Sequence, residues 1–269
     1  MKNLFLSIAI VFLVLQANAQ NIGQEGDTLM NYVDINGLKQ GHWKKTYENG
    51  VLQYETYFVN GKPVGDFKRY DKSGNIYAHL VHDTVSEFAR AQFFYRSGKI
   101  AATGNYIGKE KDSIWNYFDD NGILYLQESF KKGVKNGAFR KYTSEKVLIE
   151  EVNWKDGVKN GSWRKFFTSG EIMWESNYVN NKLEGESKSW FRNGKIYKEG
   201  VFRNDLMEGP WLKYTENGNI DKVYQYKKGI SPEADKENDD MMRELNNNRN
   251  KFDEPKGPND IDWLRGKTR

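Results

Sequence analysis

Few side chains in this sequence combine in a pattern that supports catalysis or metal binding. The three histidines are His42, His79 and His82, and the chain contains no cysteine. His79 and His82 lie three positions apart in a segment of strand character, so they should point to opposite faces and form a poor pair of metal ligands. No G-x-S-x-G, H-E-x-x-H or phosphate-binding glycine loop is present, and no acidic cluster resembles a calcium loop. We therefore expect no enzymatic activity, no metal and no cofactor.

The charged residues favour pairing on a sheet over acid–base chemistry. They make up 29% of the chain, but the formal net charge is only +4 and no sustained basic block occurs, so nucleic-acid binding is not expected. Many carboxylates recur at fixed intervals, in step with lysine and arginine positions. The apolar content of 38% is low, whereas the aromatic content of 14% is high. This composition favours a thin sheet.

The elements that position these side chains follow a 24-residue repeat, which is clearest between Trp154 and Phe202. Three columns of the repeat consist mainly of glycine, Asn and Asp, which tolerate positive φ, and we interpret all three as turns. The first column is Gly37, Gly61, Val85, Lys109, Gly133, Gly157, Asn181, Asp205 and Gly229; the second is Gly41, Gly65, Ala89, Ser113, Gly137, Gly161, Gly185 and Gly209; the third is Gly50, Gly74, Gly98, Gly122, Lys146, Gly170, Gly194 and Gly218. Segments of strand length separate the turns, so each repeat is predicted to be a β-hairpin.

Side-chain alternation along these strands predicts two different faces. We define face one by two columns: Trp43, Phe67, Ala91, Trp115, Phe139, Trp163, Ser187 and Trp211, and Phe58, His82, Tyr106, Phe130, Trp154, Tyr178, Phe202 and Tyr226. An aliphatic column six residues before the second of these is assigned to face one by its even spacing: Leu52, Ile76, Ile100, Leu124, Leu148, Ile172, Ile196 and Ile220. Face two is defined by recurring Lys/Arg–Glu positions and is predicted to carry a second aromatic row: Tyr70, Phe94, Phe118, Tyr142, Phe166, Trp190 and Tyr214.

The third glycine column suggests the strand register. Asn49-Gly50 and its equivalents are strong signals of two-residue hairpin turns. A two-residue turn there predicts the pairs Lys44–Glu55, Arg140–Glu151, Arg164–Glu175 and Lys188–Glu199, and where the charge is lost it is lost from both members, as in Gln92–Thr103, Asn116–Gln127 and Leu212–Val223. Lys68 opposite His79 is the one unmatched pair.

The third repeat, from Val81 to Thr103, departs from the pattern. Val85 and Ala89 replace turn glycines, and Thr84 to Glu87 matches a helix capping box. A short helical turn or bend at 84–92 is one interpretation. A drifted repeat with the same fold is the other, and we favour it.

The two ends differ in character from the repeats, which we place at 33–229 after a lead-in at 20–32. Residues 1–19 have a positive start, a short apolar run and an Ala17-Asn18-Ala19 cleavage site, which is typical of a signal peptide, so no transmembrane segment is expected after cleavage. Residues 230–269 form a charged tail that is predicted to be disordered, with one helix at 234–247 as the alternative. Trp263 and Leu264 are candidates for docking onto a partner or the sheet end.

The columns together resemble the MORN-variant repeat: G-x-W-x-x-aromatic, then Asn-Gly, then an aliphatic residue, then an aromatic residue before a glycine turn. The resemblance covers about residues 33–229. It implies an elongated, twisted, antiparallel sheet of consecutive hairpins that is used in binding. Bacterial proteins with such arrays are commonly described as YwqK-type antitoxins.

We therefore expect an all-β protein with an elongated single-layer twisted antiparallel sheet of about eight hairpins. Its expected function is that of a non-catalytic scaffold of the bacterial envelope, exported to the periplasm, the outer membrane or the medium, which binds an envelope or secreted protein through a sheet face or edge. The aromatic row from Tyr70 to Tyr214 is the candidate binding site, because exposed apolar patches mark contact sites. Two alternatives remain open. One is glycan binding, since aromatic rows also stack on sugars, and the other is inhibition of a toxin.

Overall fold

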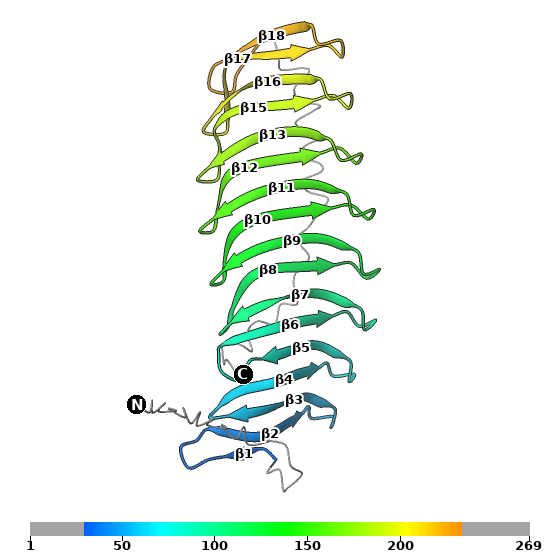
Figure 1. Cartoon of the computed structure of the whole chain (residues 1–269), viewed down its shortest axis with the longest axis vertical. Helices are drawn as coiled ribbons and strands as arrows, with labels where there is room; N and C mark the ends of the chain where they lie inside the picture. The colour runs from blue at the N-terminus through cyan, green and yellow to red at the C-terminus, as the bar shows by residue number, and fades with distance from the viewer. Residues whose placement is uncertain (1–29, 233–269) are drawn as a thin grey trace, which may run out of the picture.

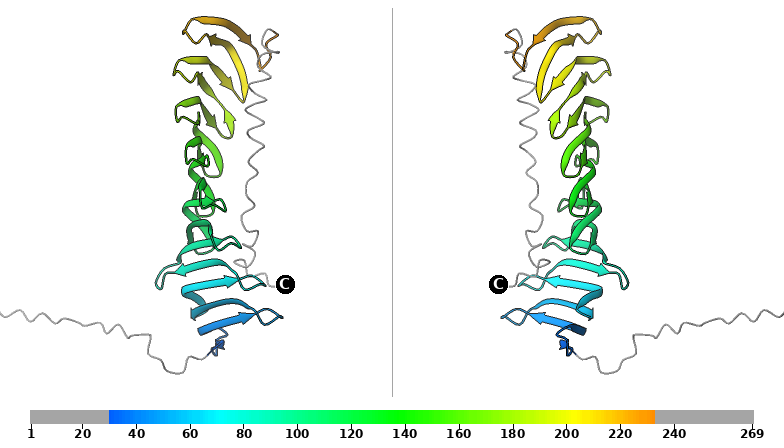
Figure 2. Two further views of the ribbon diagram at one scale, coloured as in Figure 1. Left: turned by 90° about the vertical axis from the view of Figure 1, so that its right-hand side faces the viewer. Right: turned by 90° about the vertical axis from the view of Figure 1, so that its left-hand side faces the viewer.

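The structure, a computed structural model, describes residues 30–232 and consists of one sheet of 18 antiparallel strands (Figure 1). Each strand pairs with its neighbours in sequence, so the chain climbs the sheet from β1 to β18. The side views show a single layer whose strands turn progressively along the long axis (Figure 2). The predicted elongated, twisted, single-layer antiparallel sheet is confirmed.

Most strands have seven to nine residues. They are β1 (Tyr32–Val33), β2 (Lys39–Thr46), β3 (Leu52–Val59), β4 (Lys62–Tyr70), β5 (Ile76–His82), β6 (Phe88–Phe94), β7 (Ile100–Ile107), β8 (Glu110–Phe118), β9 (Leu124–Lys131), β10 (Val134–Tyr142), β11 (Leu148–Lys155), β12 (Val158–Phe166), β13 (Ile172–Val179), β14 (Lys182–Leu183), β15 (Gly185–Trp190), β16 (Ile196–Arg203), β17 (Leu206–Tyr214) and β18 (Ile220–Tyr226). β14 and β15 are two parts of one strand position, because both pair with β13. The eight predicted hairpins therefore run from β2–β3 to β17–β18, and β1 pairs with the outer edge of β2.

The first glycine column forms the tight connections between hairpins. Val59 pairs with Lys62, and the two residues between them, Asn60 and Gly61, have φ values of 49° and 75°. Positive φ at both positions is the signature of a type I′ turn, whose twist matches that of the flanking strands. The Gly61 amide also donates to the carbonyl of Lys39 in the preceding hairpin, and equivalent bonds recur up this edge. Each turn is thereby tied to the repeat before it.

The third glycine column forms a longer loop than the predicted two-residue turn. The Tyr47 amide bonds to the Val51 carbonyl, and the Gly50 amide bonds to the Tyr47 carbonyl, so three residues close the hairpin. This is a type I turn followed by Gly50 in the left-handed region, at φ 81°. A bulge in the next strand then shifts the register by one residue, since Thr46 pairs with Leu52 but Lys45 pairs with Tyr54. The longer loop and the bulge compensate each other.

The predicted charge pairs are therefore confirmed although the predicted turn is wrong. Lys44 lies opposite Glu55, and the same holds for Arg140–Glu151, Arg164–Glu175, Lys188–Glu199, Gln92–Thr103, Asn116–Gln127, Leu212–Val223 and Lys68–His79. The bulge has a second effect: it reverses the side-chain alternation between Leu52 and Tyr54. The aliphatic column lies on face two, and its assignment to face one is wrong.

The second glycine column does not form turns. Gly41, Gly65 and Gly137 lie within strands, with φ values of 71°, 65° and 111°. Gly65 and Gly137 coincide with register shifts on the ladder to the preceding strand, between Thr56 and Tyr57 and between Lys135 and Phe139. These positions are bulges inside long strands, where positive φ bends the chain without ending it.

The third repeat keeps the hairpin fold. A four-residue loop connects Asp83 and Phe88, and the Asp83 carboxylate accepts hydrogen bonds from the amides of Val85 and Ser86. Strand β6 begins directly after this loop. The drifted-repeat interpretation is confirmed, and the alternative of a helical turn at 84–92 is wrong, because the capping-type hydrogen bonds close a loop.

The buried side chains lie on face one and form two clusters. One extends from Phe67 to Leu126 and the other from Trp174 to Tyr226. Trp115 and Trp211 are the largest fully buried residues, and each lies against a strand glycine. A Cβ at Gly104 would lie 2.2 Å from the Trp115 ring, and one at Gly200 would lie 2.2 Å from the Trp211 ring. These two glycines let an indole lie flat against the backbone in a sheet with no second layer.

Three sequence predictions fall outside the described residues. They are the signal peptide at 1–19, the tail helix at 234–247 and the docking residues Trp263 and Leu264. Within 30–232 there is no helix that is long and apolar enough to cross a membrane.

Candidate functional site

The predicted aromatic row lies on face two, along the edge formed by the three-residue loops. Each aromatic residue is the last residue of its strand, and each lies opposite a member of the aliphatic column. The pairs are Tyr70–Ile76, Phe94–Ile100, Phe118–Leu124, Tyr142–Leu148, Phe166–Ile172, Trp190–Ile196 and Tyr214–Ile220. We call these fourteen residues the aromatic–aliphatic stripe. Sequence reasoning found only its aromatic half, because the bulge that brings the aliphatic residues to the same face was not recognised.

The stripe is continuous and partly accessible. All seven aromatic side chains are half-buried, and none is fully exposed. Ile172 and Ile220 are 36% and 56% exposed. Pairing across each hairpin and strand spacing of about 4.8 Å place the fourteen side chains in one band along the sheet. The structure thus brings the predicted row together with additional apolar surface.

A ladder of charged residues runs beside the stripe. Each glutamate in its central part lies between two cations, because Glu151 pairs with Arg140 and Arg164, and Glu175 pairs with Arg164 and Lys188. The Arg140 Nε to Glu151 Oε2 distance is 2.6 Å, and the Arg164 Nε to Glu175 Oε1 distance is 2.7 Å. We call this set (Lys44, Glu55, Lys68, Arg140, Glu151, Arg164, Glu175, Lys188 and Glu199) the charge ladder. Its regular pairing leaves little excess charge on face two.

Two tyrosines connect the stripe to the charge ladder. The Tyr70 hydroxyl donates to Glu55 Oε1 at 2.8 Å, and the Tyr214 hydroxyl donates to Glu199 Oε1 at 2.7 Å. Burial, together with the bond to Glu55, raises the pKa of Tyr70 to about 12. The bond to Glu199 is the main reason that the pKa of Tyr214 is also raised. Both phenols therefore remain neutral donors at physiological pH.

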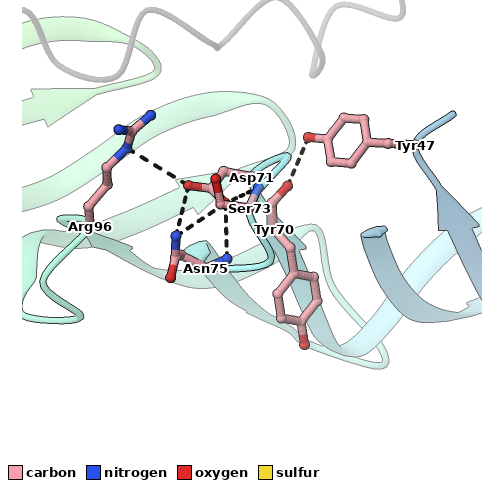
Figure 3. A network of polar contacts seen from close by, with 6 residues as sticks. All are labelled: Tyr47, Tyr70, Asp71, Ser73, Asn75 and Arg96. Atoms are coloured by element: carbon pink, nitrogen blue, oxygen red, sulfur yellow. Dashed lines mark hydrogen bonds and ion pairs between the residues drawn. The ribbon is translucent and has the colours of Figure 1, made fainter. Parts of the chain in front are cut away.

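The loops at this edge fix the ends of the stripe. In Figure 3 the Tyr47 hydroxyl donates to the carbonyl of Tyr70, which belongs to the next repeat, at 2.8 Å. Asp71 accepts from the amides of Ser73 and Asn75 at 2.8 and 2.9 Å, which closes its own loop. These backbone hydrogen bonds, with the nearby Arg96, lower the pKa of Asp71. This loop is thus held both internally and by its neighbours.

The charge ladder is interrupted in the third and fourth repeats. Gln92, Thr103, Asn116 and Gln127 replace the charged residues there, and the Gln127 amide donates to Asn116 Oδ1 at 2.9 Å. Next to this neutral section, His79 Nε2 lies 2.5 Å from Asp66 Oδ1. The neutral section divides the charge ladder into two parts.

Face one contains a feature that sequence reasoning missed. Lysine side chains lie over its aromatic rings, with Lys39 Nζ 4.2 Å from the Trp43 ring centroid and Lys111 Nζ 4.4 Å from that of Trp115. The lysines in such contacts include Lys39, Lys111, Lys135, Lys141, Lys159, Lys165 and Lys198. We call them and their rings the lysine–aromatic strip. A 24-residue spacing relates Lys111, Lys135 and Lys159, and this was the available signal.

The histidines of β5 are distributed over both faces of the sheet. His79 pairs with residues of face two and His82 contacts Phe67 on face one, which confirms that the two histidines point apart. Within residues 30–232, no group of three or more His, Cys, Asp or Glu side chains could hold a metal ion. The ladder glutamates of face two lie beside cations or tyrosine hydroxyls.

Comparison with known families supports the repeat assignment. Three segments match the model of the MORN repeat variant: residues 39–60, 183–204 and 207–228. They correspond to β2–β3 and to the last two hairpins. A search of curated proteins found no match. Among solved structures, the crystal structure of a GtfA/B complex bound to UDP and GlcNAc is 17% identical, with a TM-score of 0.22, over 56% of this chain and 27% of that one.

Proposed function

We propose that this protein is a non-catalytic repeat scaffold of the bacterial cell envelope that binds another protein through face two. The observation that supports this most strongly is the continuous, half-buried aromatic–aliphatic stripe beside a charge-compensated ladder. Contiguous apolar surface with polar borders is typical of protein contact sites, and aromatic residues are enriched there. The MORN-variant matches support a repeat scaffold, and export rests on the leader-like residues 1–19.

The geometry of face two suits an elongated partner segment. Fourteen apolar side chains form one band, and the tyrosine hydroxyls and ladder carboxylates beside it supply hydrogen-bonding groups. Such a surface fits a mixed apolar and polar protein segment. Trp263 and Leu264 in the tail remain predicted as a second contact.

The test compares affinity capture from envelope extracts by the natural chain and by two matched triple variants. The first variant, Phe94→Ala/Phe118→Ala/Phe166→Ala, removes three rings from the stripe. The control, Val59→Ala/Val179→Ala/Leu206→Ala, shortens three apolar side chains at the opposite edge of face two. These residues are 43%, 42% and 45% exposed. Quantitative mass spectrometry should recover a specific protein with the natural chain and the control but not with the stripe variant.

Two results would contradict the proposal. One is recovery of the same protein by the stripe variant, provided that circular dichroism shows both variants to be folded. The other is capture of no specific protein at all. A change in tryptophan fluorescence on addition of cell-wall glycans, lost in the stripe variant, would favour the glycan-binding alternative.

A further inference from the structure

Face one carries a group of neighbouring lysines at the end of the sheet formed by β16, β17 and β18. Near the last strands, Lys198 on β16 pairs with Lys213 on β17, and Lys213 pairs with Lys222 on β18. Three lysines are thus direct neighbours across three adjacent strands. Like charges opposite one another destabilise a sheet, whereas the charge ladder of face two alternates its signs. This end of face one therefore favours an anionic neighbour.

The burial of Lys198 also favours an anionic neighbour at this end of face one. Its side chain is 3% exposed, and its ammonium lies 5.2 Å from the Tyr224 ring centroid and 5.4 Å from that of Trp211. Ring faces attract a cation, but the cost of removing a charge from water is large and favours an anion nearby. Lys213 is paired within the sheet, because its Nζ lies 3.7 Å from Asp221 Oδ2.

From these observations we infer that face one is the docking surface for the chain's own acidic segment at 233–244. This segment begins directly after the last described residue, Pro232, which follows β18. Six of its twelve residues are acidic and two are basic: Glu233, Asp235, Glu237, Asp239, Asp240 and Glu244 against Lys236 and Arg243. The acidic segment thus begins at the end of the sheet where the three neighbouring lysines lie.

The tail is also long enough to follow the rest of the strip. From β18 to Lys111 on β8 there are nine strand spacings, or about 43 Å at about 4.8 Å each. The chain continues for 37 residues beyond Pro232. These would span about 55 Å as a helix and about 120 Å when extended, so either conformation reaches Lys111. Docking of this kind covers face one and leaves the stripe on face two accessible. It does not depend on the proposed partner.

Zero-length carbodiimide cross-linking of the full chain, read by mass spectrometry, tests the inference. The reagent joins a carboxylate to a lysine only when the two are in contact. Links from residues 233–244 should reach the strip lysine nearest β18, Lys198, and its neighbours Lys213 and Lys222. The matched controls are Lys131 and Lys155, which are exposed on face two and should form few links. Raising the salt from about 0.1 M to about 1 M should reduce the strip links several-fold, because the Debye length falls from about 10 Å to about 3 Å.

A pair of double variants gives a second readout. Lys213→Gln/Lys222→Gln removes two of the three neighbouring charges and should reduce tail links to the remaining strip lysines several-fold. Lys131→Gln/Lys155→Gln should leave them unchanged. Mixed ¹⁴N and ¹⁵N protein distinguishes links within one chain from links between chains. Equal labelling of both faces, no tail links, or links only between chains would each overturn the inference.

Discussion

The two faces of this sheet use the same kinds of residue in different ways. On face one, aromatic rings form the buried clusters, and lysines lie over the rings at 4.2–5.9 Å from their centroids. On face two, aromatic rings are half-buried beside aliphatic partners, and the cations are paired with glutamates. Aromatic and basic side chains therefore stabilise the fold on one face and form an accessible surface on the other.

The difference follows from two features of the backbone, of which the bulge recurs every 24 residues. A bulge after each three-residue loop moves the aliphatic column to face two, where it widens the stripe. Strand glycines such as Gly104 and Gly200 let large rings lie flat on face one. A single-layer sheet can thus bury its large rings on one face and leave an apolar stripe accessible on the other.

The largest expected effect comes from deleting one ring on each face of the same strand. Trp115→Ala should destabilise the protein by about 3 kcal/mol or more, because Trp115 is 1% exposed and its loss leaves a cavity. Phe118→Ala on β8 should cost about 1–2 kcal/mol, since its ring is half-buried. Urea denaturation measures both free energies of unfolding. Equal costs would contradict the assignment of stability to face one.

The next largest loss of stability is expected when a single methyl group is added to face one. Gly104→Ala places a Cβ 2.2–2.7 Å from the Trp115 ring and should cost about 2–3 kcal/mol. Thr103→Ala, the neighbouring position on face two, should cost about 0.5 kcal/mol. Thermal unfolding of the two variants gives the comparison. If Gly104→Ala proved as mild as Thr103→Ala, the close contact between indole and backbone would be refuted.

His82 is a titratable residue in an aromatic column of face one. Burial lowers its pKa from the ordinary value of 6.5, and its Nε2 has no hydrogen-bond partner among the described residues. The folded state therefore prefers neutral His82, so stability is retained above about pH 6.5 and falls as the pH drops below it. His82→Phe should gain about 1 kcal/mol and weaken this acid sensitivity.

Urea denaturation of His82→Phe at pH 5 and pH 8 tests both parts of this prediction. His42→Phe, which changes an exposed histidine on face two, serves as control and should alter stability by less than about 0.5 kcal/mol. A gain for His82→Phe that is larger at pH 8 than at pH 5 would reverse the predicted sign.

The smallest effect is expected from the charge ladder. Glu175→Gln removes a carboxylate between Arg164 and Lys188, but Arg164 and Glu175 are 40% and 39% exposed. The cost should be below about 1 kcal/mol and should shrink in 1 M salt. Chemical denaturation at low and high salt measures it. A large cost that does not change with salt would contradict this prediction, because it would make the charge ladder a main source of the protein's stability.

Patterns that repeat along the chain were the predictable part of this structure. The eight hairpins, the cross-strand charge pairs and the two aromatic columns follow from period-24 and period-2 spacing alone. Lys44 and Glu55 are paired as predicted because the extra loop residue and the bulge cancel. The register is therefore insensitive to the turn type, although the turn itself was predicted incorrectly.

The incorrect predictions arise where glycine or asparagine has more than one use. Gly50 closes a three-residue loop, Gly61 completes a type I′ turn and Gly65 lies in a bulge, yet all three have positive φ. A glycine column signals positive φ and does not specify which of these structures it serves. The missed bulge placed the aliphatic column on the wrong face, and this concealed half of the stripe.

Hydroxyl-radical footprinting of the tryptophans tests the division between the two faces most directly. Trp115 and Trp211 on face one are 1% and 0% exposed, whereas Trp190 belongs to the half-buried stripe on face two. Oxidation of the full chain, quantified by mass spectrometry, should be several-fold faster at Trp190 than at either face-one tryptophan. Equal rates, or faster oxidation of Trp115 and Trp211, would contradict the account.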